Sequence, residues 1–366
     1  MSDPASSPSG RSFGITVLAV LASFYTLYFA RAFLLPIAFA LLLAFLFSPA
    51  VRALARLHVP LPLGAALVIV TLIGVGGLAV YGLSGPVQSW AEDSPKTVAT
   101  AQARLHRLLR PLQRVTKSAQ QVETAAGGVT APGAQGPTEV VVRGPSVVSR
   151  LFGSTQRFLA GMLEVLILLY FLLAAGDLFL QKLIRALPKV RDRQKAVEIA
   201  RATEASISTY LFTTAAVNVV EGLVVTGAMY LLGMPNAPLW GALVVLLEFI
   251  PYLGSLAMTV ILTIAGLASF DDVGRGLLVP ATFLAINLVQ ANLVSPLLLG
   301  HRLALNPVAL FVSLAFWFWI WGIPGAFIAV PVLATFKILC DHIETLAPIG
   351  EFLGRRAKSE RSALVL

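Results

Sequence analysis

Long uninterrupted apolar runs dominate the pattern of hydrophobic and polar positions along this chain. A helix needs about 20 apolar residues to cross the roughly 30 Å hydrocarbon layer of a bilayer, so runs of this length predict transmembrane helices. The runs with few or no charged residues are 13–30, 33–50, 61–85, 159–176, 209–232, 239–270, 276–299 and 303–336. The pattern therefore predicts an all-α polytopic membrane protein with eight apolar segments.

Two of these runs, 239–270 and 303–336, are longer than one simple span and carry helix breakers near the centre. The breakers are Pro251 and Gly254 in the first run, and Gly322, Pro324 and Gly325 in the second. Each run fits either a long, tilted and kinked span or a re-entrant helical hairpin with its tip near the middle of the membrane. Hairpins are favoured because they put His301 and Arg302 on the cytoplasmic side. About six transmembrane helices and two broken or re-entrant hairpins are thus expected.

The paired breakers point to a transporter. Backbone that leaves the helix inside lipid exposes polar N–H and C=O groups, which is tolerated only where it lines a cavity or is buried in protein. Gly/Pro-interrupted segments in related positions are therefore a marker of a transport site. The alternative is that these residues only kink packed helices, but the repetition of breaker and length favours the functional interpretation.

Polar side chains inside the apolar runs complete a candidate substrate-binding set with the breakers. An ionisable group at membrane depth costs roughly 2.5–3.5 kcal/mol on insertion scales, so it usually faces a polar interior or pathway. The candidates are Asn218 and Glu221, which share a helix face, Glu248 beside the first breaker, Asn287, Gln290 and Asn292 in the seventh run, and Asn306 at the start of the eighth. Glu248 is the strongest, because it could bind a cation, exchange a proton or hydrogen-bond a polar solute. The structural alternative for each is a hydrogen bond that joins two helices.

Composition supports a lipid environment, and the placement of the basic residues argues against a nucleic-acid role for the net positive charge. Of the 366 residues, 57% are hydrophobic and 12% are charged, whereas soluble proteins are about a quarter charged. The net charge of +9 suggests nucleic-acid binding, but the basic residues lie in loops between apolar runs, where the positive-inside rule expects them. The basic 177–207 loop and both termini are therefore predicted to be cytoplasmic, and no nucleic-acid partner is expected.

One extramembrane region, 86–150, separates the third and fourth runs. Apolar residues spaced by three and four between Val98 and Val122 predict an amphipathic helix that Pro111 should kink or break. This helix either lies on the membrane or on its own protein, or contacts another subunit, and a flexible loop at 126–137 follows it. The predicted domains are transmembrane helices 1–85, the extramembrane insert 86–150, a transport core 151–340 and a basic cytoplasmic tail 341–366.

Enzyme and cofactor motifs are absent from the sequence. A single cysteine, Cys340, excludes an intramolecular disulfide and a cysteine-based metal site, and the four histidines have no metal-ligand spacing. The chain also lacks GxSxG, HExxH and Walker A motifs. Neither catalysis nor ATP-driven transport by this chain alone is predicted, and no cofactor or metal is expected.

Four strings, in this order, resemble the autoinducer-2 exporter (AI-2E) family of bacterial membrane proteins. They are PIAFALLLAFLFSP (36–49), LEFIPYLGSL (247–256), NLVSPLLLGHRLALNPVAL (292–310) and WGIPGAFIAVPVLATFKIL (321–339). The resemblance implies a multi-pass protein of the bacterial inner membrane that exports the quorum-sensing furanone autoinducer-2 or another small solute. It further implies a homo-pentamer in which two helical hairpins form the substrate site and move like an elevator. Some members are reported as sodium/proton antiporters.

The sequence departs from this family at two positions. Many relatives have a carboxylate just before the asparagine that is here Asn292, whereas this chain has Ala291, and Glu248 stands where an amide is common. Substrate and coupling ion therefore stay open. Three functions compete: a secondary transporter of a small polar solute, a sodium/proton antiporter that uses Glu221 or Glu248, and a non-transporting membrane scaffold. The paired breakers beside polar groups favour the first, with H+ or Na+ as possible further partners.

Overall fold

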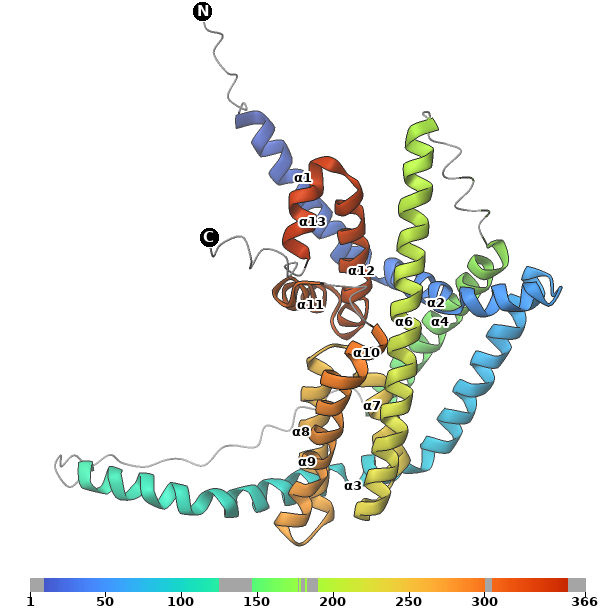
Figure 1. Cartoon of the computed structure of the whole chain (residues 1–366). Coiled ribbons are helices and arrows are strands. Elements are labelled where there is room, and N and C mark those ends of the chain that lie inside the picture. The colour runs from blue at the N-terminus through green and yellow to red at the C-terminus, as the bar shows by residue number, and fades with distance from the viewer. Residues whose placement is uncertain are drawn as a thin grey trace, which may run out of the picture. The chain divides into compact units, whose positions relative to one another are not determined.

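The chain is helical throughout the part that the structure describes. The computed structural model describes residues 10–124, 147–176, 178, 182, 190–299 and 305–354 (Figure 1). Within these ranges the β-structure is limited to one isolated bridge between Leu305 and Gly354, so the predicted all-α fold is confirmed. The predicted 126–137 loop, His301, Arg302 and the end of the basic tail lie outside the described residues.

In the described residues, one helix follows another along the chain. They are α1 (Gly10–Phe29), α2 (Arg31–Arg56), α3 (Leu61–Thr124), α4 (Val147–Ala175), α6 (Val190–Leu232), α7 (Ala237–Leu247), α8 (Leu253–Ser269), α9 (Val273–Val289), the π-helical turn η1 (Gln290–Val294), α10 (Ser295–Leu299), α11 (Pro307–Trp321), α12 (Ile323–His342), the 3-10 turn η2 (Glu344–Leu346) and α13 (Ala347–Leu353).

Several of these helices suit a bilayer. Among the described residues, the segments long and apolar enough to cross a membrane, by length and composition, are Arg31–Arg56, Leu61–Trp90, Arg193–Leu232, Val273–Leu298 and Ile323–His342. Shorter apolar helices accompany them, including α7, α8 and α11. Large apolar side chains such as Leu78 and Leu231 are exposed over most of their surface, as expected where lipid covers them. The chain is therefore a multi-pass membrane protein.

The chain divides into two compact units. Unit 1 is drawn from Met1–Val75, Leu159–Ala216 and Ser295–Leu366, and unit 2 from Gly76–Phe158 and Val217–Val294. The helices α3, α4 and α6 each contribute to both units. The two breaker segments fall in different units, so each is described within its own.

In unit 1, the second overlong run forms a hairpin and not one kinked span. The Ser313 hydroxyl of α11 donates a hydrogen bond of 3.2 Å to the backbone oxygen of Ala329 on α12. In a continuous helix these residues would be about 24 Å apart, so the two arms must fold back on each other. The reversal occurs at Gly322, whose φ of +67° favours glycine.

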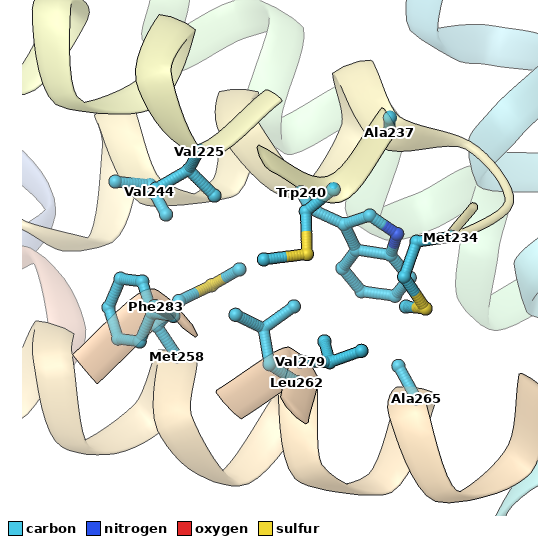
Figure 2. Close-up of a cluster of buried hydrophobic side chains, with 11 residues drawn as sticks. Val225, Met234, Ala237, Trp240, Val244, Met258, Leu262, Ala265, Val279 and Phe283 are labelled. Atoms are coloured by element: carbon cyan, nitrogen blue, oxygen red, sulfur yellow. The ribbon is translucent and has the colours of Figure 1, made fainter. Parts of the chain in front are cut away.

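The first overlong run is a hairpin as well, and it forms the core of unit 2. Figure 2 shows Val244 of α7 near Met258 of α8, and Trp240 near Leu262, so the two arms run in opposite directions. Residues from α6 and α9 complete this buried cluster. Its members are Val225, Met229, Met234, Ala237, Trp240, Val244, Met258, Leu262, Ala265, Val279 and Phe283.

The helix α3 decides half of one expectation, because Pro111 does not break it. It runs from the third apolar run into the predicted insert and continues to Thr124 without a break at Pro111. A proline removes one N–H donor from the hydrogen-bond ladder, but the turns on either side keep their own bonds, so a helix can continue through it. Within unit 2 this extension contacts α7: the Trp90 and Trp240 rings meet edge to face with centroids 6.1 Å apart.

Arg104 of α3 holds the loop between α8 and α9. Its guanidinium donates to the Leu267 backbone oxygen at 2.7 Å and to the Asp271 carboxylate at 2.9 Å. The Arg104 side chain is mostly buried, whereas the Asp271 side chain is fully exposed. The carbonyl bond should therefore matter more than the ion pair, because exposed ion pairs contribute little to stability.

We expect Arg104→Ala to lower the free energy of unfolding by about 1.5–3 kcal/mol, since it removes the bond of a charged donor to the Leu267 carbonyl while the exposed ion pair adds little. Asp271→Ala should leave the unfolding midpoint unchanged within error, because Arg104 keeps its bond to Leu267. Thermal unfolding of both variants in the same detergent measures the difference. Equal effects would show that the ion pair, and not the carbonyl bond, anchors this loop.

Candidate functional site

Four polar side chains from four elements of unit 2 meet beside the first breaker. They are Glu221 of α6, Glu248 at the end of α7, Ser255 in the first turn of α8 and Asn287 of α9. We refer to these four residues as the polar knot. The structure thus brings three of the sequence-predicted site residues into contact and adds a fourth.

Asn287 is the centre of the polar knot. Its side-chain nitrogen donates to Glu221 Oε1 at 3.1 Å and to Glu248 Oε1 at 3.2 Å. Ionised carboxylates only accept hydrogen bonds, so the amide nitrogen is the Asn287 atom that suits this position. The Ser255 hydroxyl donates to the other Glu248 oxygen, Oε2, at 3.1 Å.

The two carboxylates of the knot are close together; Glu221 is buried and Glu248 is partly buried. Because they share one donor, their Oε1 atoms lie at most about 6 Å apart, a separation at which like charges repel in a medium of low dielectric constant. Glu221 is 3% exposed and its neighbour on the same helix face, Asn218, is 2% exposed. Among the described residues, Glu221 Oε2 has no hydrogen-bond partner. Such a site favours ligands that donate hydrogen bonds or carry positive charge.

The break between α7 and α8 positions Glu248 and Ser255. Glu248 is the C-cap of α7, and its N–H donates to the Val244 oxygen. The chain then reverses through Tyr252, a non-glycine residue with φ of +64°, a strained conformation that is concentrated at functional sites. Gly254 allows the reversal to be tight, because a Cβ there would lie 2.6 Å from the Leu247 carbonyl carbon.

Close helix packing brings Glu221 to the hairpin. A Cβ on Gly222 would lie 2.6 Å from the Gly241 backbone oxygen, and a Cβ on Gly241 would clash with Gly222 in return. Small residues at such a crossing let two membrane helices approach closely. The residue next to Gly222 is Glu221, so this crossing of α6 and α7 sets its distance from Glu248.

The break between α11 and α12 in unit 1 has the same tight geometry as the break between α7 and α8, but the carboxylates that surround the α7–α8 break have no counterpart among the described contacts of Gly322, Pro324 and Gly325. Gly325 faces the end of the preceding arm as Gly254 does, since a Cβ there would lie 2.7 Å from the Trp317 carbonyl carbon. Pro324 stands in the first turn of α12, where its missing N–H is harmless. Gly322, Pro324 and Gly325 therefore have a structural explanation, and their role in binding stays a prediction, as does that of Pro251 and Gly254.

The other predicted residues lie outside the knot. Asn306 is the N-cap of α11, where Oδ1 accepts from the Val308 N–H and Nδ2 donates to the Phe352 oxygen. Asn292 is exposed and donates to the Leu288 oxygen one turn earlier on its own helix. Gln290 and Asn292 both belong to η1, a π-helical turn, and such turns often mark functional sites. Binding by these three residues stays a prediction.

Sequence reasoning missed Ser255 and the glycine pair of α6 and α7. Ser255 follows the first breaker directly, and hydroxyls in the first turn after a broken helix could have been included in the search. Gly222 lies beside Glu221 in an apolar run, where small residues mark helix crossings. No sequence feature, however, pairs Gly222 with Gly241.

Comparisons with known proteins find one family model and several named transport proteins. The AI-2E family transporter model matches residues 17–345. The AI-2 transport protein TqsA of Escherichia coli is 26% identical over 86% of this chain and 87% of its own length. A Mycobacterium tuberculosis protein named as a transport protein is 26% identical over 89% of this chain and 87% of its own. A Borreliella burgdorferi protein, also named as a transport protein, is 28% identical over 57% of each chain.

Proposed function

Because this chain belongs to the AI-2E transporter family, we propose that it carries a small polar solute across the bacterial inner membrane and binds that solute at the polar knot. Membership of the family makes the chain a membrane transporter. The identity of the solute and the place where it binds are proposed here. The observation that carries it is the meeting of Glu221, Glu248 and Asn287 beside a broken helix. Polar groups at membrane depth are costly and are typical of solute and ion pathways.

The chemistry of the knot selects the class of solute. Two carboxylates accept hydrogen bonds from hydroxyl groups, while an amide and a hydroxyl can both donate and accept. A neutral solute with several hydroxyl groups suits this set, whereas an anion would be repelled by Glu221 and Glu248. The E. coli relative is named for transport of AI-2, so AI-2 is the first solute to test.

The two hairpins suggest how the solute crosses. We propose that the hairpin α7–α8 moves with its bound solute in an elevator-like manner, together with the hairpin α11–α12. A homo-oligomer, a pentamer by analogy with the family, would supply the stationary frame. Both chain ends are proposed to face the cytoplasm, because the basic 177–207 segment, which includes the start of α6, and the basic tail follow the positive-inside rule.

Solute flux in inverted vesicles or proteoliposomes tests this function. We expect Glu248→Gln to reduce AI-2 transport at least roughly tenfold, because it replaces a charged acceptor in two hydrogen bonds that each contribute about 1.5–3 kcal/mol. Glu164→Gln is the matched control, since Glu164 is exposed on α4. Full transport by Glu248→Gln would remove the knot from the solute site, and absence of flux with any solute or ion gradient would favour a scaffold.

Sodium/proton exchange is the second candidate function. It is favoured by one observation, the buried Glu221 Oε2 without a hydrogen-bond partner among the described residues. A carboxylate oxygen in this state suits an exchanging cation. Sodium-dependent pH changes in vesicles, without AI-2, would support exchange as the main activity, and their persistence after replacement of both glutamates would contradict it.

A further inference from the structure

We propose that the last part of α3, residues 91–124, lies along the membrane surface as an amphipathic helix and binds anionic phospholipid headgroups through a basic face. We call these residues the distal part of α3. The segment of α3 that is apolar enough to span a membrane ends at Trp90, and the helix continues to Thr124, about 51 Å further along its axis. This surface lies outside the polar knot, so the proposal does not depend on the identity of the solute.

Two contacts show that the distal part of α3 runs across the open end of the hairpin α7–α8. Just before it begins, the Trp90 ring meets Trp240 of α7, which lies near Leu262 of α8. Further on, Arg104 donates to the Leu267 oxygen, which is only about 8 Å along α8 from Leu262. A straight course along the hairpin axis would carry Arg104 about 21 Å beyond Trp90, out of reach of this bond. The helix therefore runs sideways, as the teal part of α3 does in Figure 1.

The loop that Arg104 reaches lies at a membrane surface. It joins α8 to α9, and the apolar segment Val273–Leu298 that begins with α9 is long enough to span a bilayer. Charged residues stand directly before this segment: Asp271 has a fully exposed side chain, and Asp272 is the N-cap of α9. Charged groups stay at the ends of spanning helices because their transfer into hydrocarbon is costly. A helix that is bonded to this loop and crosses the hairpin therefore lies at the level of the lipid headgroups.

Helical spacing divides the distal part of α3 into an apolar face and a basic face. The apolar residues between Val98 and Val122 recur every three or four positions, so they share one face. Arg104 stands at the edge of this face, four residues before Leu108. The side of the helix that touches the α8–α9 loop is therefore the apolar side. The opposite face carries the other basic residues, which are Lys96, His106, Arg107, Arg110, Arg114 and Lys117.

The charge of this stretch selects an anionic surface. Between residues 95 and 122 the sequence has six Lys or Arg residues and no Asp or Glu. A helix with apolar residues on one face and Lys or Arg on the other lies in the plane of the membrane interface, with its apolar face at the acyl boundary. Each Lys or Arg near an anionic lipid surface strengthens binding roughly fivefold. The occupant that fits both faces at once is a bilayer surface that contains anionic phospholipid.

A coiled coil with a second copy of the chain fits this stretch less well. The residues that flank the apolar stripe of a coiled coil usually form ion pairs of opposite charge. Here the charged residues at flanking positions are Arg104, which is bonded to its own chain, and Glu123. Pro111 occupies another flanking position, and the basic faces of two copies would repel each other.

Spin-label accessibility in the full chain measures where each face lies. A label at Leu112→Cys reports the apolar face and a label at Gln121→Cys reports the opposite face, while Cys340→Ala removes the native thiol. The protein is placed in nanodiscs of phosphatidylcholine with phosphatidylglycerol. We expect the ratio of oxygen to nickel-chelate accessibility at Leu112→Cys to exceed that at Gln121→Cys at least about threefold, because one face meets the acyl boundary and the other meets water.

Removal of charge from the basic face tests the role of the headgroups. Four glutamines should weaken surface binding several-hundredfold, since each lost cation costs roughly fivefold, and the Leu112→Cys ratio should fall to the Gln121→Cys value. Glutamine has a helix propensity close to that of arginine and lysine, so the helix should persist. Nanodiscs without phosphatidylglycerol, or about 1 M NaCl, should lower the ratio without any change to the basic face. The four substitutions are Arg107→Gln, Arg110→Gln, Arg114→Gln and Lys117→Gln, and the matched control, which should leave the ratio unchanged, carries Arg185→Gln, Lys189→Gln, Arg191→Gln and Lys195→Gln.

Three results would each overturn the proposal. A Leu112→Cys label that neither oxygen nor the nickel chelate reaches would place the apolar face against protein, in this chain or in another subunit. Equal ratios at Leu112→Cys and Gln121→Cys in anionic nanodiscs would place the distal part of α3 in water. A high Leu112→Cys ratio that glutamines, salt and lipid charge all leave unchanged would show a surface helix without recognition of anionic lipid. Each result leaves the proposed solute transport to its own flux measurement.

Discussion

Replacing Asn287 by leucine is expected to reduce solute transport at least about 100-fold. Asn287 donates to both Glu221 and Glu248, and hydrogen bonds to charged groups contribute about 1.5–3 kcal/mol each. Leucine has the same branched side-chain skeleton at a somewhat larger volume, so the helix packing should largely persist while both bonds are lost. The carboxylates would then face each other without a bridging donor. Transport in proteoliposomes, normalised to the amount of folded protein, measures the loss.

A second substitution makes the Asn287 prediction specific. If repulsion between the two carboxylates causes the loss, then Glu221→Gln in the Asn287→Leu background should restore folding stability relative to Asn287→Leu alone, because one charge is removed. Thr263→Val on α8 is the control, since its hydroxyl bonds only to the Thr259 oxygen of its own helix. Near-normal transport by Asn287→Leu would exclude the knot as the site.

Replacing Gly222 by valine is expected to lower the free energy of unfolding by about 3 kcal/mol, the upper part of the range for overpacked cores. The new side chain would meet the Gly241 backbone oxygen, 2.6 Å from its Cβ, and the Val245 side chain. The backbone cannot rotate away as a flexible side chain would, so α6 and α7 must separate. Yield of monodisperse protein and the thermal unfolding midpoint measure the effect.

Gly227 provides the matched control for Gly222. It lies on the same helix, and a Cβ there would meet nothing within 4 Å. The change in helix propensity is therefore the same for Gly227→Val, and the difference between the two variants reports packing alone. Equal stability of the two variants would mean that α6 and α7 do not cross as closely as described. Because the crossing also positions Glu221, Gly222→Val should lose transport even where it folds.

The membrane character and the helix breaks were determined by the sequence itself. The length of an apolar run and the position of proline and glycine act through the local chain, because spanning length and backbone hydrogen bonding are properties of a single helix. The breaks near Pro251 and Pro324 appear in the structure where the sequence predicts them. The common face of Asn218 and Glu221 also follows from helical spacing alone.

Local rules failed where the outcome depended on context. Pro111 was expected to kink or break the insert helix; it does not break it, since α3 continues to Thr124, and the kink stays a prediction. An interior proline costs about 3 kcal/mol through one lost hydrogen bond and a clash with the preceding turn, but the bonds of the neighbouring turns can outweigh this cost, so a proline alone does not decide where a helix ends. Loop charge favoured hairpins over kinked spans without deciding between them, and contacts such as Ser313 with Ala329 show the hairpin.

Only the tertiary structure decided which polar residues form one site. Asn287 and Asn292 are equivalent in the sequence, both amides in one apolar run, but only Asn287 bridges two carboxylates. Their roles depend on which side of the helix faces α6 and α7, and that rotation is set by packing between residues far apart in the chain. The glycine contact of Gly222 with Gly241 sets the distance from Glu221 to Glu248 in the same way. Single-helix properties thus specify the candidates, and the packing of four helical elements selects among them.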